Sequence, residues 1–209
     1  NAPVPPPAPL KGRGAASNIQ GRFEREQRIS GPVDPSDSTD PAGTASAPIT
    51  VVRPQQARRV LSVNQSPDLP FDQSLNPYLG CEHGCSYCYA RPSYAYWGLS
   101  PGLDFETRIF AKTNAAQALR AELGARGYAC KPITLAGNTD PYQPAEREQR
   151  ITRAVLEVLD ETSHPVSIIT KNALVERDID LLASLARRNL VHVYVSVTTW
   201  DNGLSARLE

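Results

Sequence analysis

The stretches PITLAGNTD (residues 132–140), PVSIITKN (165–172) and LVHVYVSVTT (190–199) decide the fold class. Each contains a short β-branched run that ends in small polar residues, a pattern typical of buried parallel strands. Amphipathic segments separate the three stretches, so predicted strands and helices alternate along the chain. Such βαβ repetition predicts an α/β fold in which the carboxyl ends of the strands meet at one edge.

Three segments predict the intervening helices. Residues 113–126 and 177–188 repeat leucine or isoleucine at helical spacing, and residues 144–159 carry one apolar face. Gly127 and Asn189 stand where left-handed caps are expected after two of these helices. The predicted order is a strand with the first cysteines, then helix, strand, helix, strand, helix and strand.

The first part of the chain has a different composition. Residues 1–62 are rich in Pro, Ala, Ser, Gly and Asp, and Phe23 is their only aromatic residue, so we expect a disordered N-terminal segment. Residues 63–209 are predicted to form the packed domain. The basic stretch KGRGAASNIQGRFEREQR (11–28) is either a solvated linker or an arm for anionic partners.

Charge and hydropathy restrict the partners. The chain has 22 Lys and Arg against 22 Asp and Glu, and this balance gives no support to a nucleic-acid or membrane partner. No apolar run approaches the ~18 residues of a membrane span, and the proline-rich start lacks the apolar core of a signal peptide. We therefore expect a cytoplasmic protein without a membrane partner. The chain begins at Asn1 and contains no methionine, so we expect its N-terminus to be incomplete.

Polar residues follow each of the three predicted strands, where parallel strands deliver side chains to a common edge. They are Asn138, Thr139 and Asp140, then Lys171 and Asn172, then Ser196, Thr198 and Thr199. Any one of them is as consistent with capping a strand as with function. Their convergence on one edge with the cysteines favours a functional site.

Three of the four cysteines lie in CEHGCSYCYA, residues 81–90. Three thiolates at C-x₃-C-x₂-C spacing can bind three irons of a [4Fe–4S] cluster and leave the fourth iron open to a ligand. Structural zinc is the alternative, with His83 as the fourth ligand, although His83 lies so close to both cysteines that the loop would be strained. Gly84 is available for the tight turn, and Cys130 is predicted to be a small buried residue.

The run CEHGCSYC, with an aromatic residue before its third cysteine, resembles the signature of the radical S-adenosylmethionine (SAM) enzymes. The resemblance implies that Cys81, Cys85 and Cys88 hold a [4Fe–4S] cluster and that SAM binds the open iron. It implies reductive cleavage of SAM to a 5′-deoxyadenosyl radical, which abstracts hydrogen from an unknown substrate. It also implies an electron donor such as flavodoxin or ferredoxin. The implied fold is a partial (β/α)₆ barrel, here truncated to about four βα units, with the C-terminal part of the domain missing.

The sequence AGNTDPYQP, with Thr-Lys after the next strand, is similar to sequences of the subgroup that contains spore photoproduct lyase. The glutamate usual in this segment of the family is absent. The resemblance implies that Tyr87 lies near the adenine and that Lys171 reaches the SAM carboxylate. The other residues that it implies for SAM binding are Asn138, Thr139, Asp140, Ser196 and Thr198.

Two further functions remain open from the sequence. One is a non-catalytic zinc- or nucleic-acid-binding module in which CEHGCSYC is structural. The other, within the enzyme class, is a lyase that acts on a DNA lesion, so nucleic acid remains a candidate substrate. The sequence assigns no residue to the catalytic step on the substrate.

Overall fold

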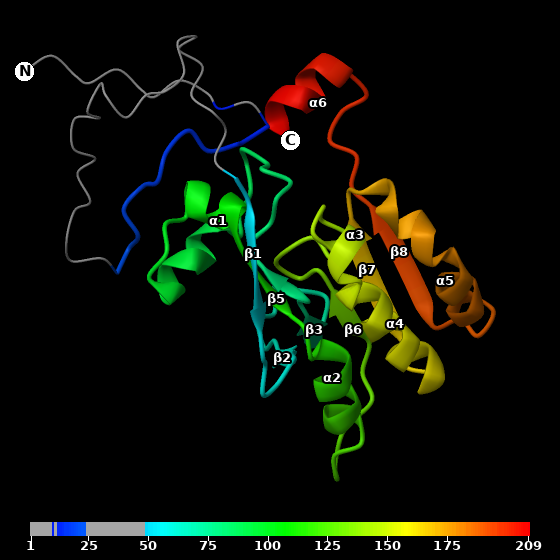
Figure 1. Cartoon of the computed structure of the whole chain (residues 1–209). Coiled ribbons are helices and arrows are strands. Elements are labelled where there is room, and N and C mark those ends of the chain that lie inside the picture. The colour runs from blue at the N-terminus through cyan, green and yellow to red at the C-terminus, as the bar shows by residue number, and fades with distance from the viewer. Residues whose placement is uncertain (1–9, 11, 24–48) are drawn as a thin grey trace, which may run out of the picture.

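The computed structural model describes residue 10, residues 12–23 and residues 49–209, which form an α/β fold with two mixed sheets (Figure 1). The strands are β1 (Val51–Gln55), β2 (Leu61–Val63), β3 (Gln73–Leu75), β4 (Tyr78–Leu79), β5 (Arg108–Lys112), β6 (Ile133–Leu135), β7 (Val166–Thr170) and β8 (Val191–Val195). The α-helices are α1 (Leu103–Thr107), α2 (Ala115–Leu123), α3 (Glu146–Gln149), α4 (Ile151–Glu161), α5 (Ile179–Ala186) and α6 (Asn202–Leu208). Two 3-10 helices are η2 (Arg91–Trp97) and η3 (Ala173–Asp178).

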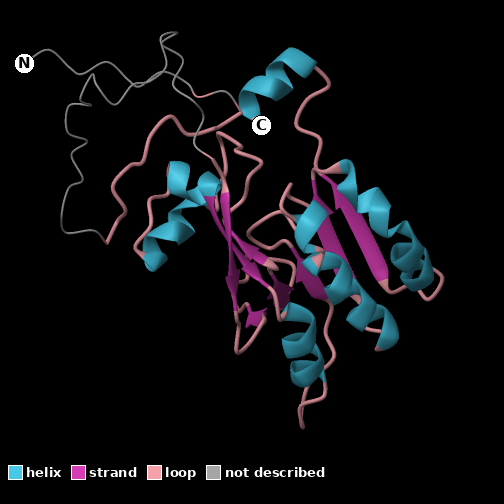
Figure 2. Ribbon diagram, viewed as in Figure 1, coloured by secondary structure: helices cyan, strands magenta, loops and turns pink. Residues whose placement is uncertain are grey.

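The larger sheet has five strands in the order β2-β3-β6-β7-β8. Strands β3, β6, β7 and β8 are parallel, with Leu75 opposite Leu135, Leu135 opposite Ile168 and Ile168 opposite Val193. β2 pairs antiparallel at the edge. The predicted alternation of helices and parallel strands is therefore confirmed, and the carboxyl ends of four strands lie along one edge (Figure 2). The burial expected of the strand in residues 190–199 is wrong, because β8 is the last strand of the described sheet and most of its residues are exposed.

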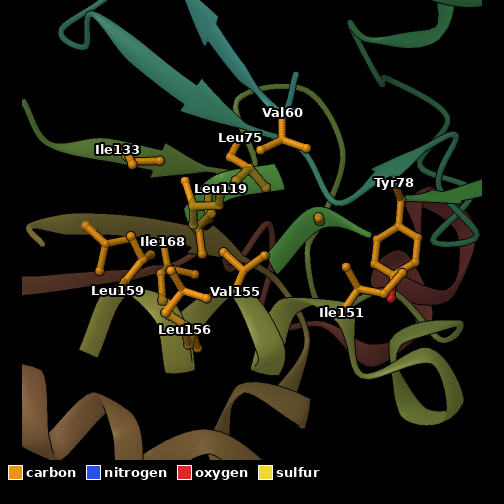
Figure 3. Close-up of a cluster of buried hydrophobic side chains, with 14 of the residues drawn as sticks. Val60, Leu75, Tyr78, Leu119, Ile133, Ile151, Val155, Leu156, Leu159 and Ile168 are labelled. Carbon is orange, nitrogen blue, oxygen red and sulfur yellow. The ribbon is translucent and has the colours of Figure 1, made fainter. Parts of the chain in front are cut away.

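The main core fills the space between this sheet and helices α2 and α4. Ile133 and Leu135 of β6 and Ile168 of β7 are fully buried. Figure 3 shows Ile133 and Ile168 on the side of the sheet that faces α4. Val155 and Leu159 of α4 are also fully buried. The helical spacing of apolar residues in α4 thus meets the alternating spacing of the strands.

A second, three-stranded sheet has the order β1-β5-β4 and was not predicted. β1 runs parallel to β5, whereas β4 runs antiparallel to it. β4 is only two residues long and ends just before the cysteines. The cysteines therefore lie in a loop that follows a strand, rather than in the strand where the sequence pattern placed them.

The prediction of disorder over residues 1–62 is wrong for the described part of that range. Residues 51–55 form β1, Val60 is 2% exposed in the main core, and residues 13–19 are hydrogen-bonded to the domain. These residues are held by partners far along the chain, so their local composition does not reveal the contacts. Residues 1–9, 11 and 24–48 lie outside the described residues.

Of the predictions for single residues and helix bounds, some are confirmed and others are wrong. Gly127 (φ 85°) and Asn189 (φ 56°) have the left-handed conformation expected of them. The helix predicted over 144–159 is two helices, because Arg150 (φ 51°) breaks the path between α3 and α4. Cys130 is exposed, so its predicted burial is wrong.

The helix predicted over residues 177–188 begins as η3 and continues as α5, with Asn172 capping the N-terminus of η3 through Leu174. No helix in the described part of the chain is long and apolar enough to cross a membrane.

Candidate functional site

The three clustered cysteines lie in the cysteine loop, residues 81–90, which connects β4 to η2 through successive turns. Cys81 and Cys85 are buried, and Cys88 is half-buried. The loop turns at Gly84, whose φ of 64° suits glycine, as the sequence predicted. The backbone N–H of Cys81 donates to the carbonyl of Phe105 at 3.0 Å, which fixes the start of the loop beside α1.

Two side chains hold the backbone of this loop from outside it. Arg91 donates to the carbonyl of Cys85 through Nη2 at 2.8 Å and Nε at 3.3 Å. Gln143, fully buried, donates to the carbonyl of Gly80 at 3.0 Å and accepts from the N–H of Glu82 at 3.1 Å. The loop has no regular structure, so these contacts replace the hydrogen bonds that a helix or strand would supply.

We call the residues that follow β6, β7 and β8 at the carboxyl edge of the larger sheet the rim. The segment after β6 forms its first part. Asn76 Oδ1 accepts hydrogen bonds from the backbone N–H groups of Asn138 (2.9 Å) and Thr139 (3.2 Å). The Thr139 hydroxyl donates to the carbonyl of Tyr78 at 3.0 Å, and Asn138 Nδ2 approaches Ser93 Oγ at 3.4 Å. This segment is thereby tied to the start of β4 and to η2.

Asp140 joins this segment to the end of β7. Its Oδ1 accepts from the Thr170 hydroxyl (2.7 Å) and from the N–H of Tyr142 (2.8 Å), and its Oδ2 accepts from the N–H of Lys171 (2.9 Å). Burial alone would raise the pKa of Asp140, but His83 and these hydrogen bonds together hold it below its usual value. His83 Nε2 lies 3.3 Å from Asp140 Oδ2, an ion-pair distance without the alignment of a hydrogen bond. Asp140 is therefore an ionised acceptor whose oxygens are already used.

Lys171 lies at the centre of a polar cluster on the far side of the rim. Its Nζ donates to the Tyr87 hydroxyl at 2.8 Å and to Glu209 Oε1 at 2.5 Å, and it lies 5.2 Å from the centre of the Tyr87 ring. The Tyr87 hydroxyl is also 2.8 Å from Thr198 Oγ1, and Tyr87 and Thr198 both donate to Glu209. Three donors thus converge on one carboxylate oxygen.

The charges of this cluster support one another. Burial would raise the pKa of Glu209, but hydrogen bonds from Lys171, Thr198 and Tyr87 lower it to about 2. Burial would lower the pKa of Lys171, yet Glu209 and Tyr87 raise it above its usual value. The ammonium group and its hydroxyl neighbours therefore bind the Glu209 carboxylate and stabilise its charge.

A cavity of about 200 Å³ brings the cysteine loop and the rim together. Its lining includes all three cysteines of the loop and most of the residues that the sequence marked as SAM contacts. These lining residues are Cys81, Cys85, Cys88, Tyr87, Asn138, Thr139, Asp140, Lys171 and Ser196. Thr198 is outside the lining and reaches the site through Tyr87. The remaining lining residues are His83, Tyr89, Ala136, Ile169 and Thr170.

Two of the thiols that face this cavity have raised pKa values, so they hold their protons more tightly than a free cysteine does. Burial raises the pKa of Cys81 to about 12. Burial also raises the pKa of Cys85, and the nearby ammonium of Lys171 opposes that effect. A metal that binds thiolates must displace these protons, so metal loading should release protons.

The three thiols are the donors that a cluster would use. All three line one cavity, which matches in number the protein ligands of a [4Fe–4S] cluster with one open iron. His83, the fourth ligand of the zinc alternative, lies against Asp140. Within the described residues, no group of three or more Cys, His, Asp or Glu side chains is arranged to hold a metal ion.

Sequence comparison identifies the class of protein. The family model of the radical SAM superfamily matches residues 75–208. The chain therefore belongs to the radical SAM superfamily, a class that carries out SAM-dependent radical chemistry and typically uses a [4Fe–4S] cluster together with SAM.

The similar curated proteins are longer than this chain. Uncharacterised proteins of Mycobacterium tuberculosis and Mycobacterium bovis are each 40% identical over 141 residues, which cover 68% of this chain and 42% of the relative. An uncharacterised protein of Methanocaldococcus jannaschii is 26% identical over 140 residues, 65% of this chain and 48% of the relative. The chain thus spans less than half the length of these relatives. No solved structure is significantly similar to it.

Sequence reasoning missed the residues that support the site from behind. Arg91, Gln143 and Asn76 contact backbone groups of the loop and rim, and their partners are not recognisable from spacing. One indication of such residues was present in the sequence. Gln143 and Glu106 are polar residues that directly follow aromatic residues of the core.

Proposed function

We propose that this protein is an enzyme that cleaves SAM reductively and uses the resulting radical to abstract hydrogen from a substrate. One observation carries the proposal: three cysteines at C-x₃-C-x₂-C spacing and a carboxylate-binding lysine line the same cavity at the carboxyl edge of parallel strands. Membership of the superfamily gives the chemical class, and the residues that line the cavity support the roles proposed for them below.

Cys81, Cys85 and Cys88 would hold the [4Fe–4S] cluster, which when bound supplies the electron that splits SAM into methionine and a 5′-deoxyadenosyl radical. Two of the thiols are buried, so the loop shields them from water before any metal is loaded. Cys130 is exposed and outside the cavity, and it takes no part.

Lys171 would bind the carboxylate of SAM, with Tyr87 and Thr198 as further donors. The support is the Glu209 carboxylate, which these three side chains already bind and which stands in for the carboxylate of the ligand. Tyr87 is 51% exposed and lines the cavity, so its ring is open to an adenine, and a purely core role does not fit it.

Asp140 is better suited to positioning than to direct contact. Its oxygens accept from Thr170, Tyr142 and Lys171, and its charge faces His83, which leaves little capacity for a ligand. Asn138, whose side chain makes one long contact, and Ser196, which lines the cavity, keep capacity for the amino group or ribose of SAM. Thr139 is occupied by the carbonyl of Tyr78.

The proposal also covers the complete fold, the electron donor and the substrate. The four parallel strands would be part of a (β/α)₆ barrel. An electron donor such as flavodoxin or ferredoxin would reduce the cluster. The spore photoproduct lyase-like subgroup and a DNA lesion as substrate rest on the resemblance of AGNTDPYQP alone, and net charge adds nothing to them.

Anaerobic reconstitution with iron and sulfide tests the proposal. We expect about four irons per chain, a brown absorption that SAM perturbs, and release of 5′-deoxyadenosine on reduction. Alanine at Cys81, Cys85 or Cys88 should abolish stable iron binding, whereas Cys130→Ala should retain it. Stoichiometric zinc that excludes iron would contradict the proposal and favour a structural metal module.

A further inference from the structure

A short stretch near the N-terminus lies against the back of the cysteine loop. We call residues 13–19 the arm; Figure 1 shows this blue segment passing α1. The N–H groups of Gly14 and Ala15 donate to the two oxygens of Glu106 at 3.1 and 2.9 Å. Farther along, Asn18 exchanges two hydrogen bonds with Asp104, through Nδ2 at 3.2 Å and Oδ1 at 2.8 Å. These contacts join positions more than 80 residues apart in the sequence.

The arm and the loop approach so closely that only glycine fits between them. A Cβ atom on Gly14 would lie 1.7 Å from the carbonyl oxygen of Gly84, the turning residue of the cysteine loop. Across the same interface, a Cβ atom on Gly102 would lie 2.2 Å from the carbonyl oxygen of Ser17. Since both obstacles are backbone atoms, neither can move aside without displacing the arm.

A buried ion pair connects the arm to a cysteine. Glu106 is fully buried, and its Oε1 accepts from Arg91 Nη2 at 2.5 Å. The same Nη2 donates to the carbonyl of Cys85 at 2.8 Å. The arm, Glu106, Arg91 and Cys85 therefore form one continuous set of hydrogen bonds. A carboxylate buried in this way holds its partners firmly, because leaving any of them unpaired is costly.

We propose that the arm is a positioning segment that fixes the cysteine loop and closes its outer side to solvent, and this inference rests on the proposed cluster in that loop. The three thiols face the cavity on one side, while the arm covers Gly84 and the backbone behind them. The sequence left open a basic arm that binds anionic partners. In that stretch, Arg13 contacts the carbonyl of Glu106 (3.2 Å) and the hydroxyl of Thr50 (2.8 Å), and residues 11 and 24–28 lie outside the described residues.

Gly14→Ala tests the proposal with the smallest possible change. The added methyl group prevents close docking of the arm and touches no residue of the main core. Gly124→Ala is the matched control, because Gly124 ends α2 with ordinary dihedral angles far from the loop. Hydrogen–deuterium exchange of the metal-free protein measures the amides of residues 12–19 and 81–106. The rate of loss of cluster absorption in air measures shielding in the reconstituted protein.

We expect Gly14→Ala to speed exchange in both segments by about tenfold and to speed cluster loss by a similar factor, with an unchanged melting temperature. Gly124→Ala should change neither rate. Exchange at wild-type rates in Gly14→Ala would show that the arm does not hold the loop, and faster exchange with unchanged cluster loss would show that it does not shield it; either result overturns the proposal. If the wild type binds no cluster, the proposed function fails, and exchange alone then decides whether the arm positions the loop.

Discussion

Two fully buried glutamates, Glu146 and Glu106, play matching parts in different regions of the molecule. Each pairs with an arginine: Glu146 with Arg177 at 2.8 Å, and Glu106 with Arg91 at 2.5 Å. Each also accepts hydrogen bonds from two consecutive backbone N–H groups. The chain therefore uses the same arrangement of a buried carboxylate twice.

The difference lies in what each glutamate joins. Glu146 accepts from the N–H groups of Thr152 (3.0 Å) and Arg153 (3.3 Å) at the start of α4, and from the Tyr78 hydroxyl. These partners belong to elements packed on the main core. Glu106 instead joins the arm to Arg91 and so to the cysteine loop, beside a small cluster around Tyr94 and Phe105. One carboxylate holds regular elements together, and the other holds an irregular loop.

The largest effect is expected from Glu146→Gln. The substitution leaves the half-buried Arg177 with Asp178 as its remaining carboxylate partner, and it removes the charge that accepts from two backbone N–H groups and the Tyr78 hydroxyl. An amide N–H then faces backbone donors, so the free energy of unfolding should fall by about 3–5 kcal/mol. Denaturant unfolding measures the loss. Glu161→Gln, in an exposed pair with Arg120, is the control and should cost less than about 1 kcal/mol. A loss for Glu146→Gln as small as that of the control would remove it from the core network.

Glu106→Gln should act locally rather than globally. The free energy of opening of the arm and the cysteine loop should fall by about 3 kcal/mol, while the main unfolding transition moves less than it does for Glu146→Gln. Hydrogen exchange resolved by segment separates the two effects. Equal loss of protection in β6 and β7 would show that the two regions unfold as one and would undo the comparison.

The same contrast explains what the sequence could predict. β6, β7, α4 and α5 were recognisable from their apolar residues. Those residues recur at strand or helix spacing in β7, α4 and α5, and β6 is a short run that is buried throughout. The polar residues that end those strands, such as Asp140 and Lys171, could be placed on one rim for the same reason. Their position is a consequence of strand register, and register follows the apolar pattern.

The loop region could not be predicted in that way. β1 pairs with β5 across more than 50 residues, and the arm reaches Glu106 across about 90. Such contacts depend on side chain–backbone hydrogen bonds and on glycines at close approach, which leave no periodic trace in the sequence. The cysteine spacing indicated the chemistry of the loop, but nothing in it indicated how Arg91 and Gln143 hold the loop in place.

Lys171→Ala tests ligand binding without changing either of the two buried glutamates or their partners. Lys171 follows β7, and its backbone is held by Asp140, so the substitution should leave the fold and the cluster intact. Loss of a charge-assisted hydrogen bond to the SAM carboxylate costs roughly 1.5–3 kcal/mol, about ten- to a hundredfold in affinity. Binding isotherms on the reconstituted protein measure it, with Lys131→Ala, an exposed lysine paired with Asp72, as the control. Unchanged affinity would remove Lys171 from the SAM site.

The smallest expected effect is a loss of stability of the sheet region at acidic pH. His164 precedes β7 and is 4% exposed; its Nε2 lies 2.8 Å from the Tyr128 hydroxyl and its Nδ1 lies 3.0 Å from the carbonyl of Pro165. Burial lowers the pKa of His164, although the contact with Pro165 opposes the shift. The unfolded chain therefore takes up a proton near pH 6.5 that the folded chain resists, so stability is complete above that pH and declines as pH falls below it.

Denaturant unfolding between pH 7.5 and about pH 5 should show this decline in the wild type and a shallower one in His164→Gln. Because His164 directly precedes Pro165 and β7, exchange in β6 and β7 should respond to acid before exchange in residues 81–106; the reverse order would place the acid-sensitive group elsewhere.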